Sequence, residues 1–185
     1  MTALIIAAIT AALQNHLQNR LAPFASEASL SDAKVTVLPP DRIALGSEEP
    51  NQINLFLYRV SPNASLSRGR TKAGTTPALS LDLFYLLTLY GTEALNIEKL
   101  LGLAISALGE ISSATLKESL SVAAKDPKSS RQESRIALPA DLIARQDLKI
   151  TPQFLSIEDM SKLWSSLQAK YRPSLAYQIS GVIME

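Results

Sequence analysis

Few residues in this chain are of a type that could carry catalysis or hold a metal ion. The sequence contains no cysteine and one histidine, His16, which excludes disulfides, Cys/His metal sites and thiolate nucleophiles. His16 follows Leu13 by about one helical turn, at the edge of an apolar stripe, where a partly buried histidine is ordinarily structural. The sequence also lacks the Gly-x-Ser-x-Gly motif of serine hydrolases. We therefore predict no catalytic residue, no bound metal and no cofactor.

Residues 69–76 (GRTKAGTT) have the glycine spacing of a phosphate-binding loop. In such a loop a lysine follows the second glycine, and a helix begins directly after it. Here Thr75 follows Gly74, and Pro77 and a strand pattern come next. The segment is therefore not predicted to bind a nucleotide.

Asp82 is the only acidic residue between Asn51 and Thr92, and it lies within an apolar strand pattern. A carboxylate in that setting needs a paired cation or several hydrogen-bond donors, because burial disfavours its charged form. The ordinary interpretation is a structural ion pair, with Arg59 as the candidate partner, or a hydrogen bond to a neighbouring loop. The alternative, a catalytic acid, lacks a second acid or base nearby. Two adjacent acidic pairs, 48–49 and 158–159, have ordinary placements in a loop and in the first turn of a predicted helix.

A basic segment separates the two strongest strand patterns. Residues 63–76 contain Arg68, Arg70 and Lys72 and no acidic residue. Such a loop is usually only solvated, although it can also reach an acidic protein partner. Nucleic acid is disfavoured, because the segment has no aromatic residue and the net charge is only +1.

The whole chain has the composition of one globular domain. It has 185 residues, of which 46% are hydrophobic and 19% charged, and a chain of this size can bury a sizeable core. Residues 3–13 are nearly all apolar, but this run is too short to cross a hydrocarbon layer of about 30 Å. The first basic residue, Arg20, follows the run instead of preceding it as in a secretory signal. We expect no direct membrane insertion.

Hydrophobic periodicity predicts the elements that position these residues. Apolar positions at helical spacing predict a helix that ends before Pro23, a second over residues 93–108 and a third after Ser156, whose spacing to Asp159 suits a capping box. Alternating or continuous apolar runs predict strands. The predicted strands cover residues 34–38, 52–60, 79–90, 135–138, 148–150 and 174–184. We predict a single α+β domain over residues 1–185, with a mixed or antiparallel sheet flanked by about three helices and an exposed loop at 125–133.

Four blocks of sequence together resemble a known family. They are residues 54–63 (NLFLYRVSPN), residues 79–91 (LSLDLFYLLTLYG), residues 98–102 (EKLLG), and residues 163–168 (LWSSLQ) with 171–177 (YRPSLAY). Their order and spacing are similar to those of the cap, or tube-terminator, proteins of phage-tail-like contractile injection systems. The chain departs from this family at residues 66–69 (LSRG), where relatives usually have an arginine followed by an asparagine. Many relatives also continue past the final strand, so we expect only the core capping domain here.

The resemblance implies a non-enzymatic structural protein with a fold similar to phage tail terminators. Relatives form a six-fold ring on the distal end of the inner tube, stop its polymerisation and tie the sheath end to it. The implied partners are other copies of this chain, the tube protein and the sheath protein. The implied location is the cytoplasm during assembly and the injection particle afterwards. Candidate residues for contact with tube, sheath or a neighbouring copy are Asn63, Arg68, Arg70, Lys72, Lys125, Lys128 and Arg131.

Two alternatives belong to other functional classes. A small-molecule or nucleotide-binding enzyme would use Asp82 and the basic segment, and would have a deep pocket converging on Asp82. A ligand-binding or adaptor domain would bind an acidic protein or a nucleic acid through residues 63–76 alone. That binding would weaken steeply with salt.

Overall fold

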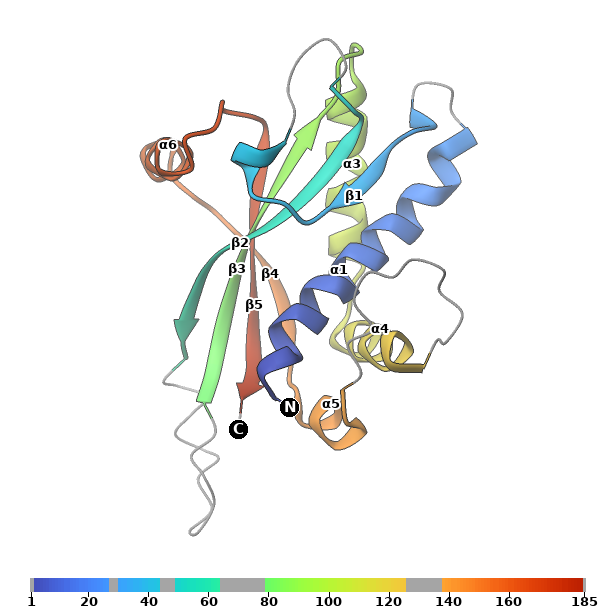
Figure 1. Cartoon of the computed structure of the whole chain (residues 1–185), viewed down its shortest axis with the longest axis vertical. Coiled ribbons are helices and arrows are strands. Elements are labelled where there is room, and N and C mark those ends of the chain that lie inside the picture. The colour runs from blue at the N-terminus through green and yellow to red at the C-terminus, as the bar shows by residue number, and fades with distance from the viewer. Residues whose placement is uncertain (1, 27–29, 44–48, 64–78, 126–137, 185) are drawn as a thin grey trace.

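The computed structural model describes residues 2–26, 30–43, 49–63, 79–125 and 138–184. A five-stranded sheet lies at the centre, with α1, α3 and α4 on one side and α6 on the other (Figure 1). The helices are α1 (Ile5–Leu21), α3 (Asn96–Gly109), α4 (Ser113–Lys125), α5 (Ala140–Arg145) and α6 (Ile157–Ser166). The strands are β1 (Lys34–Thr36), β2 (Gln52–Pro62), β3 (Leu79–Tyr90), β4 (Lys149–Gln153) and β5 (Ser174–Met184). Short 3₁₀ turns include η2 (Ala22–Ser26) and η4 (Pro40–Arg42).

The sheet is mixed, and its strand order is β1-β2-β3-β5-β4. Strand β1 runs parallel to β2, and all other neighbouring strands are antiparallel. The long strands β2, β3 and β5 occupy the middle, where both faces of a strand can be covered by other elements. This explains why their sequences are nearly continuously apolar instead of strictly alternating.

The main core lies between the sheet and the helical layer. From α1 it contains the apolar stripe predicted by helical spacing, including Ile5, Ile9, Leu13 and Leu17, all of which are fully buried. From β3 it contains alternate residues, since successive side chains of a strand point to opposite faces. These are Leu81, Leu83, Tyr85, Leu87 and Leu89. Burial of each large aliphatic side chain contributes about 1.5–3 kcal/mol. The four α1 residues therefore contribute strongly to the packing of the helical layer on the sheet.

His16 has the structural role expected of it. Its ring is half-buried, and its Nε2 lies 3.0 Å from the carbonyl oxygen of Ala107, to which it donates a hydrogen bond. The contact joins α1 to α3 at a distance of 91 positions in the sequence.

Among the described α-helices, α6 covers the second face of the sheet, at one end (Figure 1). Leu86, Tyr90, Trp164 and Ala176 are buried outside the main core. Trp164 of α6 donates a weak hydrogen bond from its indole nitrogen to Ser174 Oγ at 3.4 Å and packs against Tyr171, with ring centroids 5.7 Å apart. Asn54, fully buried on β2, accepts hydrogen bonds from Thr36 and from the backbone N–H of Leu38 and donates one to the Leu38 carbonyl. It thereby ties the segment after β1 to the sheet.

The predicted α+β class is confirmed, and most predicted strands are present within one or two residues of their expected bounds. The helix number is a correction: the described residues contain five α-helices and not about three. Helix α4 mixes small apolar residues with polar and charged ones, and its two leucines, Leu116 and Leu120, are buried. Helix α5 is only six residues long. Neither therefore has a clear periodic pattern. The predicted strand at 135–138 lies largely outside the described residues; Leu138 is buried but belongs to no strand.

In the described ranges, no single helix has both the length and the apolar composition needed to span a membrane. Only α3 taken together with Ser113–Ser121 would pass that test, and these two segments meet at an angle of 95°.

We expect Gly181 to be indispensable for the fold. Its φ is 82°, and a Cβ atom added there would lie 1.9 Å from the backbone oxygen of Asp147. Because an alanine would be strained and would also clash with backbone, Gly181→Ala should lower the free energy of unfolding by about 3 kcal/mol or more. Urea unfolding followed by circular dichroism measures this loss.

The matched control is Gly102→Ala in α3, where an added Cβ meets no atom within 4 Å. Alanine favours helix over glycine by about 1 kcal/mol, so this variant should gain stability. Equal effects of the two substitutions would contradict the assignment.

Candidate protein-contact surfaces

The end of the sheet away from α6 contains a β-bulge that exposes an aromatic surface. The register of β2 against β3 shifts between Leu57 and Arg59, which leaves Tyr58 as an extra residue. Such bulges bend a strand and redirect its side chains. Beyond the bulge Arg59 pairs with Phe84 and Ser61 pairs with Asp82. Since directly paired residues share a face, these four side chains lie on the same side of the sheet.

Asp82 is held by Asn63 at this end. The Asn63 side-chain amide donates to both carboxylate oxygens, at 2.9 and 3.2 Å, and its backbone N–H donates to the Ser80 carbonyl at 2.8 Å. The Arg59 guanidinium lies instead over the Phe84 ring, 5.0 Å from its centroid. In the described part of the chain the hydrogen-bond interpretation of Asp82 therefore applies, and the candidate ion pair with Arg59 is not formed. The backbone hydrogen bond from Asn63 to Ser80 already holds Asn63 beside Asp82, so its short side chain can bind the carboxylate.

The aromatic surface is only partly covered by the chain itself. Tyr58 and Phe84 are half-buried and tilted against each other, with ring centroids 6.3 Å apart. Burial raises the pKa of the Tyr58 hydroxyl, and the charge of Arg59 opposes that change. Aromatic side chains and arginine are the residue types enriched at protein interfaces, so this end of the sheet is chemically suited to contact another protein.

Most of the other sequence candidates lie outside the described residues. Arg68, Arg70 and Lys72 belong to the segment that joins β2 to β3, and Lys128 and Arg131 belong to the segment after α4. Lys125 is the last residue of α4. Of the candidate contact residues, the structure therefore places the side chain of Asn63, at the start of the basic segment.

The sheet also has backbone edges with no described strand beside them. Strand β1 pairs with β2 only from Gln52 to Asn54, so residues 55–62 face no strand on that side among the described elements. Strand β4 forms the opposite edge. Unpaired edges present N–H and C=O groups to which a strand of another chain can add.

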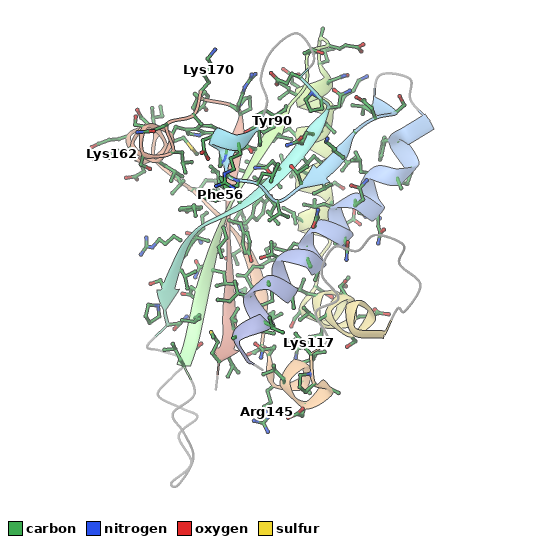
Figure 2. All side chains as sticks on the ribbon, viewed as in Figure 1. Phe56, Tyr90, Lys117, Arg145, Lys162 and Lys170 are labelled. Carbon is green, nitrogen blue, oxygen red and sulfur yellow. The ribbon has the colours of Figure 1, made fainter. Side chains whose placement is uncertain are left out.

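A buried ion pair that the sequence did not reveal holds the other end of the sheet together. Glu49 and Arg172 meet at 2.6 Å, with side chains only 6% and 23% exposed. The second Glu49 oxygen accepts the backbone N–H of Gly91 at 3.1 Å. The Arg172 guanidinium lies 5.7 Å from the ring centroid of Tyr90. Tyr90 is labelled in Figure 2. Burial raises the pKa of Tyr90, and the Arg172 charge opposes this.

This ion pair joins the start of β2, the end of β3 and the start of β5. Glu49 lies in a loop, as the sequence predicted, but its burial and its pair with Arg172 were not predicted. The partners are 123 positions apart, so no local pattern connects them. The described residues also contain no group of three or more His, Asp or Glu side chains that could hold a metal ion.

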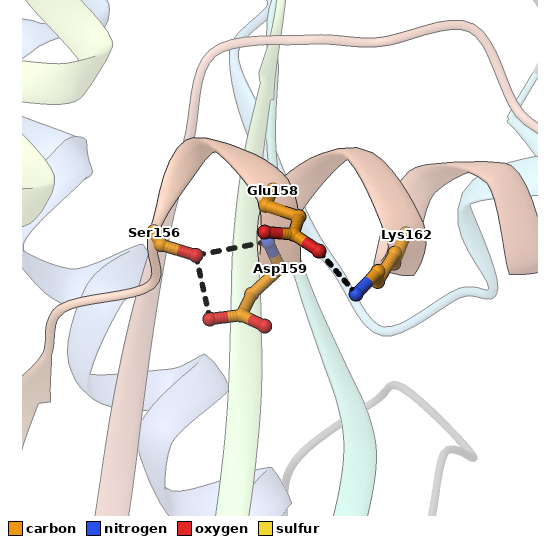
Figure 3. Close-up of polar contacts among 4 residues, drawn as sticks. All are labelled: Ser156, Glu158, Asp159 and Lys162. Carbon is orange, nitrogen blue, oxygen red and sulfur yellow. Dashed lines mark hydrogen bonds and ion pairs between the residues drawn. The ribbon is translucent and has the colours of Figure 1, made fainter.

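Helix α6 carries a second apolar surface. Its start is fixed by the predicted capping box: Ser156 Oγ accepts the Asp159 backbone N–H at 3.0 Å and donates to its carboxylate at 2.7 Å (Figure 3). Lys162 pairs with Glu158 one turn away at 2.5 Å. Beside the helix lies an open pocket of about 570 Å³ whose apolar lining includes Met160, Trp164 and Tyr171. A smaller pocket of about 380 Å³ lies between Phe24, Leu30 and α3. Asp82 lines neither pocket.

We expect the Glu49–Arg172 pair to behave as one unit in stability measurements. Arg172→Met leaves a buried carboxylate without its counter-ion, which should cost about 3 kcal/mol, as should Glu49→Leu for the converse reason. The double variant should cost clearly less than the sum of the two. Urea unfolding of all four chains measures the coupling.

Lys162→Met is the matched control, because its pair with Glu158 is exposed. It should change stability by less than about 0.5 kcal/mol. Additive losses in the Glu49–Arg172 cycle would show that the pair is not a unit.

The chain is similar to known proteins both in sequence and in fold. The sequence matches the Pvc16 N-terminal domain family over residues 7–185. No curated protein sequence matches the chain. The solved structure of the sheath/tube terminator of PVC, an extracellular contractile injection system, in its extended state has 15% identity and a TM-score of 0.51, and the match covers 89% of this chain and 56% of that one. The tube-terminating cap of the anti-feeding prophage has 14% identity and a TM-score of 0.46, with 86% and 52% covered.

The chain thus spans little more than half the length of these two structures. The likeness to the PVC terminator shows a shared fold, which confirms the fold expected from the four sequence blocks. The family match covers nearly the whole chain and confirms the resemblance itself. This chain belongs to the Pvc16 N-terminal domain family.

Proposed function

We propose that this chain is a structural cap that ends polymerisation of the inner tube of a contractile injection system. The observation that carries the proposal is the family match over residues 7–185. The fold shared with a sheath/tube terminator supports it. The chemistry of the described surface agrees, because it offers apolar, aromatic and strand-edge contacts. Such groups suit assembly with other proteins and supply no catalytic constellation.

In this proposal several copies, six by the family resemblance, close into a ring at the distal end of the tube. A terminator needs one face that matches the last tube ring and a second face that cannot template another. A ring of identical copies supplies both if one surface of each copy contacts a different surface of the next. The same ring anchors the sheath end, which makes the tube protein, the sheath protein and the chain itself the partners. Assembly takes place in the cytoplasm before the cap becomes part of the particle.

The proposed contacts with tube, sheath or neighbour begin at Asn63. Its three hydrogen bonds to β3 fix the point at which the basic segment leaves the sheet. From this fixed point Arg68, Arg70 and Lys72 extend the contact surface, and Lys125, Lys128 and Arg131 provide a second basic segment. The edge of β2 that faces no described strand adds backbone groups to this contact, and the Tyr58–Phe84 surface adds aromatic area.

Particle length tests the proposal directly. Cells that assemble the particle without this chain should produce tubes with a broad, longer length distribution, and sheaths that slip from their tubes, because nothing stops polymerisation or holds the sheath end. Electron microscopy of purified particles measures both. Re-expression of the natural chain should restore a narrow distribution.

Two variants separate the contact segments in the same experiment. Alanine at Arg68, Arg70 and Lys72 together, or at Lys125, Lys128 and Arg131 together, should reduce capping while the folded chain persists. Lys162→Ala, on exposed α6, is the control and should cap normally. A narrow, unchanged length distribution with firmly held sheaths in cells without the chain would overturn the cap assignment.

A further inference from the structure

Helix α6 and its two connections are held to the sheet by one buried side chain. Residues 154–171 are all within the described part of the chain, and Trp164, at 3% exposure, is the only buried residue among them. By contrast, seven residues of α1 are buried. A segment that buries little apolar surface opens locally at a much lower free-energy cost than the core of the same protein.

The contacts of α6 side chains with the sheet converge on Ser174 of β5. The indole nitrogen of Trp164 donates to Ser174 Oγ at 3.4 Å, and the Ser174 hydroxyl donates to Met160 Sδ, also at 3.4 Å. Both hydrogen bonds are long and therefore weak. The Trp164 ring packs against Tyr171, but Tyr171 belongs to the same segment and is itself exposed.

The segment has firmer contacts within itself. The capping box between Ser156 and Asp159 and the Glu158–Lys162 pair are both internal to the start of α6 (Figure 3). The open pocket beside the helix is lined by residues between 155 and 171, and among the described residues no strand contributes to its lining. Separation of the segment from the sheet would therefore leave these internal contacts in place.

Both ends of this segment are fixed to the sheet. Gln153, the last residue of β4, precedes it and donates a hydrogen bond from its Nε2 to Gln178 Oε1 at 2.8 Å. Arg172 follows it and forms the buried ion pair with Glu49. Because none of residues 154–171 belongs to a described strand, they can move between these two anchors without loss of any strand pairing.

We propose that residues 154–171 form a strap that swings away from the sheet as one unit when Trp164 leaves its site, while the sheet and the helical layer stay folded. In the closed state the strap covers the part of β5 that carries Ser174. In the open state Trp164 and that part of the sheet are accessible to another molecule. The strap follows from packing alone and does not depend on the proposed cap function.

Hydrogen exchange of the full chain, followed by mass spectrometry, tests the strap. After correction for intrinsic rates, amides of α6 should exchange at least 100-fold faster than those of α1 and β3. Trp164→Ala should remove the remaining protection of α6, whereas α1 and β3 should stay at least 100-fold protected. The matched control is Ile157→Ala, because its side chain is 92% exposed; it should change exchange in α6 by less than threefold. Protection of α6 equal to that of α1, or unchanged by Trp164→Ala, would overturn the strap.

A cross-link separates opening of the strap from fraying of the helix ends. The chain has no cysteine, so Met160→Cys together with Ser174→Cys provides one pair of thiols at the contact between α6 and β5. Bridging of this pair with a short bifunctional thiol reagent should slow exchange in α6 at least tenfold relative to the same variant left unbridged. If bridging leaves the exchange unchanged, α6 frays without leaving the sheet, and the proposal is wrong.

Discussion

The packing of α1 against the helix-facing side of β2, β3 and β5 is the interaction on which the rest of the structure depends. Its buried stripe from Ile5 to Leu21 belongs to the same core as alternate side chains of β3 and contains more buried apolar residues than α3 does. Helices α3 and α4 extend this layer. Among the described α-helices, α6 alone lies over the opposite face of the sheet, at one end. The uncovered end is where the Tyr58 bulge, Arg59 and Phe84 lie, so the fold leaves a rigid, partly apolar surface for another protein.

Two polar contacts hold strand ends at opposite ends of the sheet. At one end Glu49 and Arg172 join three strands through a buried pair. At the other end Asn63 and Asp82 fix the point where β2 leaves the sheet. Both devices rigidify the long central strands at positions far apart in sequence. Such a rigid framework is compatible with the proposed ring, because closure of a ring depends on a fixed angle between the two contact surfaces of each copy.

The sequence predicted the parts of this fold that have strong periodicity. Spacing alone predicts the α1 stripe, the strands 79–90 and 174–184, and the Ser156 capping box. In each case the signal is the order of residue types within one short segment. Helix α4 (SATLKESLSVAAK) was missed because its large apolar residues Leu116 and Leu120 are separated by polar and charged residues, and its other apolar positions are mostly alanine. The Glu49–Arg172 pair and the choice of Asn63 over Arg59 as partner of Asp82 depend on strand register and the bulge at Tyr58. Neither leaves a local sequence signal.

The most direct measurement of the central claim is a cryo-electron microscopy reconstruction of the distal end of the intact particle. If the chain is the cap, its five-stranded sheet will be recognised in a ring of copies seated on the last tube ring and in contact with the end of the sheath. A terminal tube ring that carries a different protein, or this chain located elsewhere along the particle, would contradict the account.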